Sequence, residues 1–474
     1  MSFISITFLF FLPIVFLVYF IVPMKQKPWV MLFASYSFYA YWDWRYLPLI
    51  FISTIVDYYC ALLMGKYSER SERRPFLYLS LLVNLGILIS FKYWNFVGSN
   101  LNGLFDLELE LHNLLLPLGI SFYTLQTLSY TFDVYLGKIK PEKKLSDFCL
   151  YVSFFPQLVA GPIERSGHLI PQLKTLGIPT QKQFRHGLLL IVWGVFLKLV
   201  IADNLTIFIH SIYFVDTIYP FWIYWLAGGL ALVKIYCDFM AYSEMARGVA
   251  KLFGVELSIN FRRPLFAKTL REFWQRWHIS LTRWIGDYVF KPLALKYKSK
   301  VYRNVITILT LCLIGLWHGA SWNFIMFGVL QGVIILLWDP IACVFNNNIK
   351  IDIAYRRAIG MLMVAISMMF TTTIFYIVDT TILIEIIQRQ LDVTSMFMPF
   401  SPFKLEGKTS FVFSLSGILI LLLHSYLCEY KKIDIFEMVA VRQSFYSWPI
   451  ALIISMLIIS VGKFSNEQFI YFEF

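Results

Sequence analysis

The chain has 474 residues, of which 58% are hydrophobic and only 15% are charged. Soluble domains carry about 25% charged residues, so this composition excludes a soluble globular protein and indicates a polytopic membrane protein. The net charge of +12 comes from basic residues that border apolar stretches. It therefore argues against nucleic acid as a partner and for anionic lipid headgroups.

The apolar stretches have helical length and predict membrane spans along the whole chain. In chain order these spans are Ile4–Val22, Trp29–Ala40, Leu47–Met64, Phe76–Val97, Leu114–Val134, Leu188–Phe214, Phe221–Met240, Val305–Leu316, Trp322–Trp338, Ala358–Val378, Ser410–Cys428 and Pro449–Val461. Two apolar segments, Leu150–Ala160 and Phe290–Leu295, are too short to cross about 30 Å of hydrocarbon and predict re-entrant or interfacial structure. We therefore expect one all-α membrane-embedded domain, residues 1–474, with about 10–12 transmembrane helices plus re-entrant segments.

The placement of charge predicts a topology. The segments Lys66–Arg74, Lys138–Lys144 and Arg262–Arg303 are basic, whereas Gly98–Asn113 is acidic and has no Lys or Arg. Basic loops collect in the cytoplasm, so the acidic loop is expected outside. This scheme places His278 at the cytoplasmic surface and His318 deeper, toward the opposite approach to the membrane.

Cysteine spacing predicts neither a disulfide framework nor a metal site. The six cysteines are scattered through apolar segments, and no pair has the spacing of metal ligands. They are Cys60, Cys149, Cys237, Cys312, Cys343 and Cys428. We interpret them as small core residues.

A histidine stands near the centre of the longest uncharged run. No Asp, Glu, Lys or Arg occurs between Asn304 and Trp338, and His318 lies inside this run, between Trp317 and Gly319. An ionisable residue at membrane depth is a functional-site hypothesis, although a hydrogen-bonded core histidine is the alternative. We predict that His318 is a general base that removes a proton from an alcohol, which then attacks an acyl thioester.

Polar residues near His318 are weaker candidates. Trp317 and Asn323 are predicted substrate contacts because they flank the imidazole. For Asn323 and Ser321 the alternative is helix capping or backbone hydrogen bonding.

A second histidine segment runs from Glu272 to Leu281. On one helix, Trp274, Trp277 and Leu281 would share a face, which is also typical of an interfacial amphipathic helix. His278 suits acid–base chemistry because free imidazole titrates near neutral pH. Arg276 is a candidate contact for a phosphate-rich donor.

Two further segments supply candidate substrate-binding residues. Asp238 and Ser243 stand at the end of an apolar stretch, where Asp238 could position substrate or pair with a basic residue. Gln157 lies in Phe155–Arg165, where Pro and Gly predict a turn near a membrane surface.

Together these segments resemble the membrane-bound O-acyltransferase family, within it the bacterial alginate O-acetyltransferase branch. The resemblance spans about Ile50 to Trp338 and also rests on Pro117–Gln126, Tyr130–Gly137 and Ile201–Asn204. It implies a helix bundle around a central tunnel, with His318 as the principal catalytic histidine and His278 as the second active-site position.

The resemblance also implies the reaction and its location. Acetyl-CoA would be the donor on the cytoplasmic side of a bacterial inner membrane, with no cofactor held by the protein. The acetyl group would pass to a polysaccharide hydroxyl or to a periplasmic partner of the SGNH-hydrolase type. The chain reads Ile374–Asp379 where the branch usually has a Phe-Arg-Ala-like element, so acceptor contacts are expected to differ.

Three alternatives stay open at this point. The acceptor could be peptidoglycan or another cell-envelope glycan. The protein could instead be a lipid or polysaccharide transporter in which His318 relays protons. It could also be a non-catalytic scaffold for a cell-surface synthase, but the presence of both Trp-His elements favours an enzyme.

Overall fold

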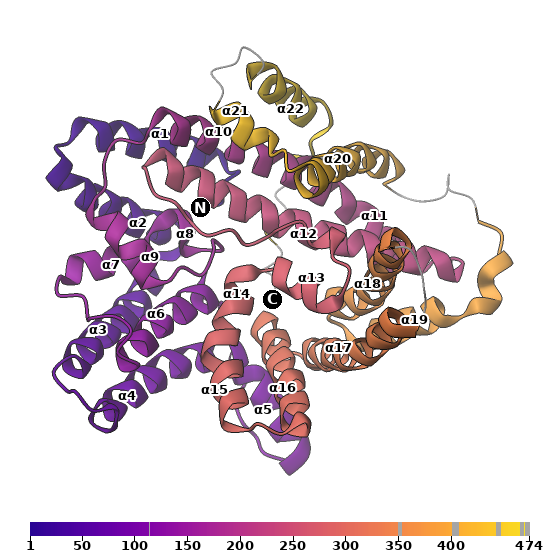
Figure 1. Ribbon diagram of the computed structural model, residues 1–474, viewed down its shortest axis with the longest axis horizontal. Coiled ribbons are helices and arrows are strands. Elements are labelled where there is room, and N and C mark those ends of the chain that lie inside the picture. Colours follow the sequence, from indigo (N-terminus) through magenta and orange to yellow (C-terminus); the bar gives the residue numbers. More distant parts are fainter. Residues whose placement is uncertain (113, 349–352, 401–406, 442–446, 465–468, 470–474) are drawn as a thin grey trace. The chain divides into compact units, whose positions relative to one another are not determined.

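The computed structural model describes residues 1–112, 114–348, 353–400, 407–441, 447–464 and 469 (Figure 1). All regular elements in these residues are helices, which confirms the all-α prediction. The chain divides into two compact units, one of residues 1–191 with 242–258 and one of residues 192–241 with 259–474. The assignment of a single domain stays a prediction.

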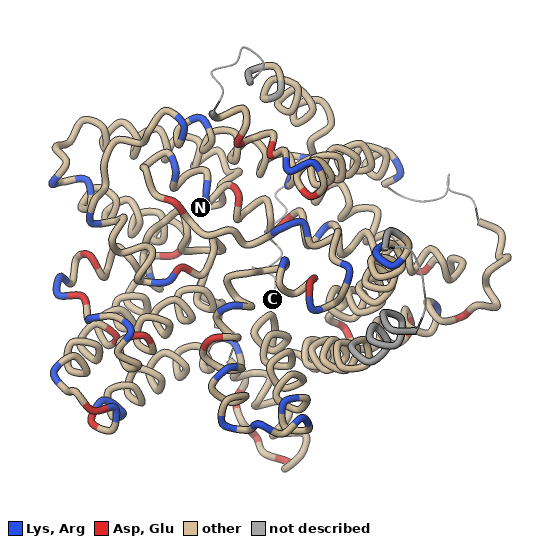
Figure 2. The backbone as a smooth tube through the Cα atoms, viewed as in Figure 1, with Lys and Arg blue, Asp and Glu red and all other residues tan. Residues whose placement is uncertain are grey.

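Many helices are suited to a membrane by length and composition. Among the described residues, seven helical stretches are long and apolar enough to cross one, and three shorter apolar helices accompany them. The long stretches are Met24–Met64, Arg70–Phe105, Gln181–Tyr213, Phe221–Leu252, Lys300–His318, Tyr355–Tyr376 and Lys408–Lys431. Charged residues gather mainly at helix ends and in connections (Figure 2). The protein is therefore a multi-pass membrane protein.

The first unit contains one helix that other helices enclose. Its elements are α1 (Ile6–Ile21), η1 (Met24–Gln26), α2 (Lys27–Asp43), α3 (Leu47–Met64), α4 (Arg70–Leu88), α5 (Trp94–Phe105), α6 (Ile120–Tyr135), α7 (Leu145–Ser153), α8 (Phe155–Leu158), α9 (Ser166–Lys174) and the start of α10 (Gln181–Phe196). The predicted span Leu114–Val134 is shorter in the structure, because α6 starts after Gly119, whose φ is +72°. Residues 120–131 are all buried, so protein surrounds this helix.

The second unit contains the histidine segments. Its elements are η4 (Leu197–Ala202), α11 (Asp203–Tyr213), most of α12 (Phe221–Leu252), α13 (Leu270–Arg276), α14 (Ile279–Ile285), α15 (Lys291–Lys296), α16 (Lys300–His318), α17 (Trp322–Asn348), α18 (Ile353–Tyr376), α19 (Thr380–Leu391), α20 (Lys408–Tyr426), η9 (Leu427–Lys431), α21 (Ile435–Val441) and α22 (Ser447–Val461).

Glycines let α16 and α17 pack closely, as the two neighbouring helices in Figure 1 show. A Cβ atom on Gly315 would lie 2.1 Å from the carbonyl oxygen of Phe324, and one on Gly328 would lie 2.4 Å from that of Leu311. Small residues permit such backbone approach between membrane helices. This packing holds the end of α16, where His318 lies, against the start of α17.

Candidate active site

His318 is the last residue of α16 and is only 3% exposed. The helix ends there because Gly319 adopts an extended conformation, and a Cβ at Gly319 would lie 2.1 Å from the ring of Phe324. The imidazole packs edge-on against Phe375, with 5.0 Å between ring centroids. His318 thus ends a candidate span inside the protein.

His278 occupies a sharp turn between α13 and α14. Its backbone is left-handed, with φ +42° and ψ +54°, and its side chain is 1% exposed. Asn260 supports the turn: its carbonyl accepts from the Ile279 amide at 2.8 Å and its side-chain oxygen from the Ser280 amide at 3.3 Å. Non-glycine residues in this conformation store strain of about 1–3 kcal/mol and cluster at functional sites.

The turn at His278 overturns one expectation. The segment from Glu272 to Leu281 is not one amphipathic helix, because α13 ends at Arg276. The left-handed turn buries the ring of His278 within the protein, and its placement on the cytoplasmic side stays a prediction. Charge patterns report which loops are basic, but not how a tight turn directs one side chain.

The structure brings the two histidines together. Their ring centroids are 6.5 Å apart, and the indole of Trp317 packs against His278 at 5.5 Å. A cavity of about 20 Å³ adjoins His318, which is room for about one water molecule. A ligand larger than a water molecule fits there only if the lining side chains move. The lining residues are Leu232, Ile235, Phe273, Trp274, Trp277, His318, Phe327, Met368, Thr372 and Phe375.

A buried amide network positions the aromatic wall of this cavity. The indole nitrogen of Trp274 donates to Gln331 Oε1 at 3.1 Å, and Gln331 Nε2 donates to Thr371 Oγ1 at 2.7 Å. These bonds connect α13, α17 and α18. Sequence reasoning missed Gln331 and Phe375; the amide of Gln331 inside the uncharged run was the available signal.

Burial also decides the charge state of His278. Loss of hydration lowers the pKa of His278 to about 3, because burial disfavours the charged imidazolium. At neutral pH the side chain is a neutral imidazole, which can both donate and accept a hydrogen bond.

The shifted pKa of His278 predicts loss of stability in acid. The unfolded chain, with its histidine pKa near about 6.5, binds the proton more strongly than the folded chain does. The free energy of unfolding therefore falls as pH drops below about 6.5, by up to about 1.4 kcal/mol per pH unit. Thermal unfolding at about pH 7.5 and about pH 5.5 measures this, and His278→Asn should reduce the pH dependence. An unchanged dependence would contradict the assignment.

Asn323 and Arg276 have protein partners. Asn323 Nδ2 donates to the carbonyls of Ile377 and Val378, both at 2.8 Å, so it holds the segment after α18 against α17. This supports the backbone-bonding alternative for Asn323. Arg276 pairs with Glu272 at 2.6 Å and Glu429 at 2.9 Å. Substrate contacts by Asn323, Arg276 and Trp317 stay predictions.

Asp238 belongs to a buried ion triad. Lys198 Nζ lies 2.9 Å from Asp238 Oδ1 and 2.8 Å from Asp203 Oδ1, and all three residues are buried. The triad joins η4, α11 and α12 within the second unit. Of the two interpretations of Asp238, the structure supports pairing with a basic residue.

Lys198→Met should destabilise the protein by about 3–5 kcal/mol, because two buried carboxylates lose their counter-charge. The midpoint of thermal unfolding in detergent measures the effect. The matched variant adds Asp203→Asn and Asp238→Asn to Lys198→Met and should regain part of the loss. If the triple variant is less stable than the single one, charge is not the cause.

Ser243 and Gln157 lie in the first unit. Both are buried, and the Gln157 amide exchanges hydrogen bonds with the amide of Gln126 at 2.7 and 3.2 Å. Their substrate contacts stay predictions.

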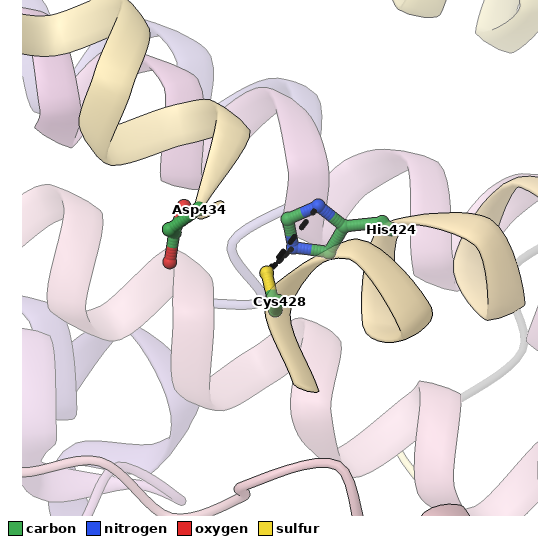
Figure 3. Close-up of side chains that lie close together, drawn as sticks. All are labelled: His424, Cys428 and Asp434. Atoms are coloured by element: carbon green, nitrogen blue, oxygen red, sulfur yellow. Dashed lines mark hydrogen bonds between the residues drawn. The ribbon is translucent and has the colours of Figure 1, made fainter. Parts of the chain in front are cut away.

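One group in the described part of the chain has ligand types suited to a metal ion. His424, Cys428 and Asp434 place one possible ligand atom each within 4.8 Å of one another, the first two one helical turn apart (Figure 3). The spacing between cysteines does not reveal this group, because it contains only one cysteine. The His424 ring and Cys428 Sγ are 3.7 Å apart, which suits a thiol–imidazole hydrogen bond, and the Arg263 guanidinium lies beside the thiol. The positive charge of Arg263 opposes binding of a metal cation at this group. We therefore assign the group neither a metal ion nor a part in catalysis.

The family model for membrane-bound O-acyltransferases matches residues 29–378. The chain belongs to the membrane-bound O-acyltransferase family. The protein is therefore an O-acyltransferase. The match covers both histidine segments and their packing partners from α12 to α18.

Relatives of this O-acyltransferase are named for acyl transfer to peptidoglycan, alginate or teichoic acid. This chain is 35% identical over 357 residues to the peptidoglycan O-acetyltransferase of Helicobacter pylori, and the match covers 68% of this chain and 67% of that protein. It is 37% identical over 343 residues to the probable alginate O-acetylase of Azotobacter vinelandii, covering 70% and 67%. It is 27% identical over 244 residues to the teichoic acid D-alanyltransferase of Streptococcus thermophilus, covering 47% and 56%.

Proposed function

We propose that this O-acyltransferase transfers acetyl groups from acetyl-CoA, on the cytoplasmic side of a bacterial inner membrane, to an exported polysaccharide. The supporting observation is the pair of buried imidazoles with 6.5 Å between ring centroids, at the end of a candidate span. Relatives with 35–37% identity carry names of acetyl transfer to alginate or peptidoglycan, which favours acetyl as the acyl group and a glycan as the acceptor.

The proposed step needs one base at the acceptor hydroxyl. A neutral imidazole of His318 takes the hydroxyl proton while the oxygen forms a bond to the thioester carbon. The carbon–sulfur bond then breaks, and the coenzyme A thiolate leaves and receives a proton. His278 is close enough to hydrogen-bond a reacting group near His318, and burial keeps it neutral.

The acceptor hydroxyl in this step allows two routes to the polysaccharide. It belongs either to the glycan itself, or to a periplasmic partner of the SGNH-hydrolase type that then acetylates the glycan. The presence or absence of such a partner in a reconstituted reaction distinguishes these routes.

Consumption of labelled acetyl-CoA by the purified protein tests the function. The full chain is placed in lipid nanodiscs with alginate oligosaccharides or peptidoglycan fragments as acceptors, and with or without the periplasmic partner. We expect coenzyme A release together with acetylated product, and neither with His318→Ala. Movement of glycan across vesicles without consumption of the donor would instead support a transporter.

Thiol labelling tests the proposed sides of the membrane. Glu108 lies in the acidic loop and Lys298 in a basic segment, and both are exposed in the structure. In intact cells, cysteine at Glu108→Cys should react with an impermeant thiol reagent, whereas cysteine at Lys298→Cys should react only after lysis. A chain with its natural cysteines replaced by alanine provides the background. The reverse pattern would exchange the donor and acceptor sides.

A further inference from the structure

The first unit contains a large open pocket that neither His278 nor His318 lines. Its volume is about 1040 Å³. It is lined by η1 and the start of α2, and by the connection between α6 and α7. The start of α7 and the last residue of α9 complete the lining. The acyl-transfer step proposed above makes no use of these elements.

Basic side chains dominate this pocket. Five lysines line it against two carboxylates, Glu142 and Asp147. Both carboxylates face one lysine: Lys174 Nζ lies 2.5 Å from Glu142 Oε2 and 3.9 Å from Asp147 Oδ2. In the part of the chain that the structure describes, the other four lysines form no ion pair. These four, which we call the lysine cluster, are Lys25, Lys140, Lys143 and Lys144.

The pocket also has an apolar wall at the start of a candidate span. Met24 and Trp29 line it and are 58% and 51% exposed, and the stretch Met24–Met64 is long and apolar enough to cross a membrane. Tryptophan favours the interface between lipid and water, and basic residues at the end of a span favour the cytoplasmic leaflet. These preferences favour a position of the lysine cluster and the exposed indole at the level of lipid headgroups.

We propose that this pocket binds the phosphate headgroup of an anionic phospholipid from the cytoplasmic leaflet. Ammonium groups bind phosphate as point charges, and basic pockets beside membrane helices suit headgroups with more than one phosphate. The apolar wall would contact the upper part of the acyl chains. Four lysines without carboxylate partners favour a bisphosphate lipid such as cardiolipin over a lipid with a single phosphate.

Photo-crosslinking of the unaltered full chain tests the site without any variant. The protein is reconstituted in phosphatidylcholine with a trace of photoactivatable cardiolipin or photoactivatable phosphatidylcholine, and labelled peptides are identified by mass spectrometry. We expect cardiolipin to label the peptides around Met24–Leu32 and Lys138–Asp147 preferentially. Equal labelling by both lipids, or labelling elsewhere only, would overturn the proposal and leave the lysines as a solvated face.

A charge-matched pair of variants gives the second test. One replaces the lysine cluster with glutamine: Lys25→Gln, Lys140→Gln, Lys143→Gln and Lys144→Gln. The other removes the same charge from an exposed basic segment of the second unit: Lys296→Gln, Lys298→Gln, Lys300→Gln and Arg303→Gln. In native mass spectrometry we expect at least about tenfold weaker cardiolipin retention in the first variant and little change in the second. Equal losses would overturn the proposal.

A soluble phosphate ligand is the competing source of the same chemistry. Excess coenzyme A or inorganic pyrophosphate is added during crosslinking. We expect labelling by cardiolipin to persist. Specific loss of pocket labelling with coenzyme A would overturn the lipid assignment and indicate a soluble ligand.

Discussion

Replacing His318 with alanine lowers acyl transfer by about 10²- to 10⁴-fold while the protein still inserts into the membrane. The reason is loss of the base that takes the acceptor proton in a buried site. The rate of labelled acetyl-CoA consumption by purified protein measures the loss. His318→Gln should be equally inactive, because glutamine fills a similar volume but does not accept a proton near neutral pH.

Two controls separate chemistry from folding in the His318 variants. Thermal unfolding of His318→Ala shows whether the contact with Phe375 matters for stability. His210→Ala changes an exposed histidine at the end of α11 and should leave the rate unchanged. A His318 variant that keeps more than about half of the rate would be incompatible with a general base.

His278→Asn combined with His318→Ala should be no slower than the slower single variant. The two rings lie 6.5 Å apart, so we expect them to serve one reaction centre, and residues that act as a unit lose activity non-additively. Each single change is expected to cost about 10²-fold or more in rate. Asparagine is the appropriate replacement at position 278 because it tolerates the left-handed backbone better than most residues do.

Donor affinity distinguishes one centre from two. With a single centre, coenzyme A binding should be similar in His278→Asn and His318→Ala, and the losses in rate should overlap. Losses that multiply in the double variant, or weaker coenzyme A binding in His278→Asn alone, would instead assign the histidines to separate steps.

The sequence alone was sufficient to predict the class of protein and the family to which it belongs. Composition and the length of apolar runs predicted an all-α membrane protein, because spanning lipid requires about 20 apolar residues per helix. The motifs in fixed order, from the segment around Gly119 to that around His318, predicted the acyltransferase family. The sequence also made His318 a candidate site residue, since an ionisable residue in an uncharged run is costly.

Tertiary structure decided which residues surround His318. The burial of His278 depends on a left-handed turn held by Asn260, and no periodicity in the segment reveals it. The ion pair of Asp238 with Lys198 and the bond of Trp274 to Gln331 join residues distant in the chain. Such contacts follow from how helices pack, and packing depends on shape and on small residues such as Gly315 and Gly328. Hydropathy and charge along one segment report its environment, whereas the partner of each side chain is set by the neighbouring helix.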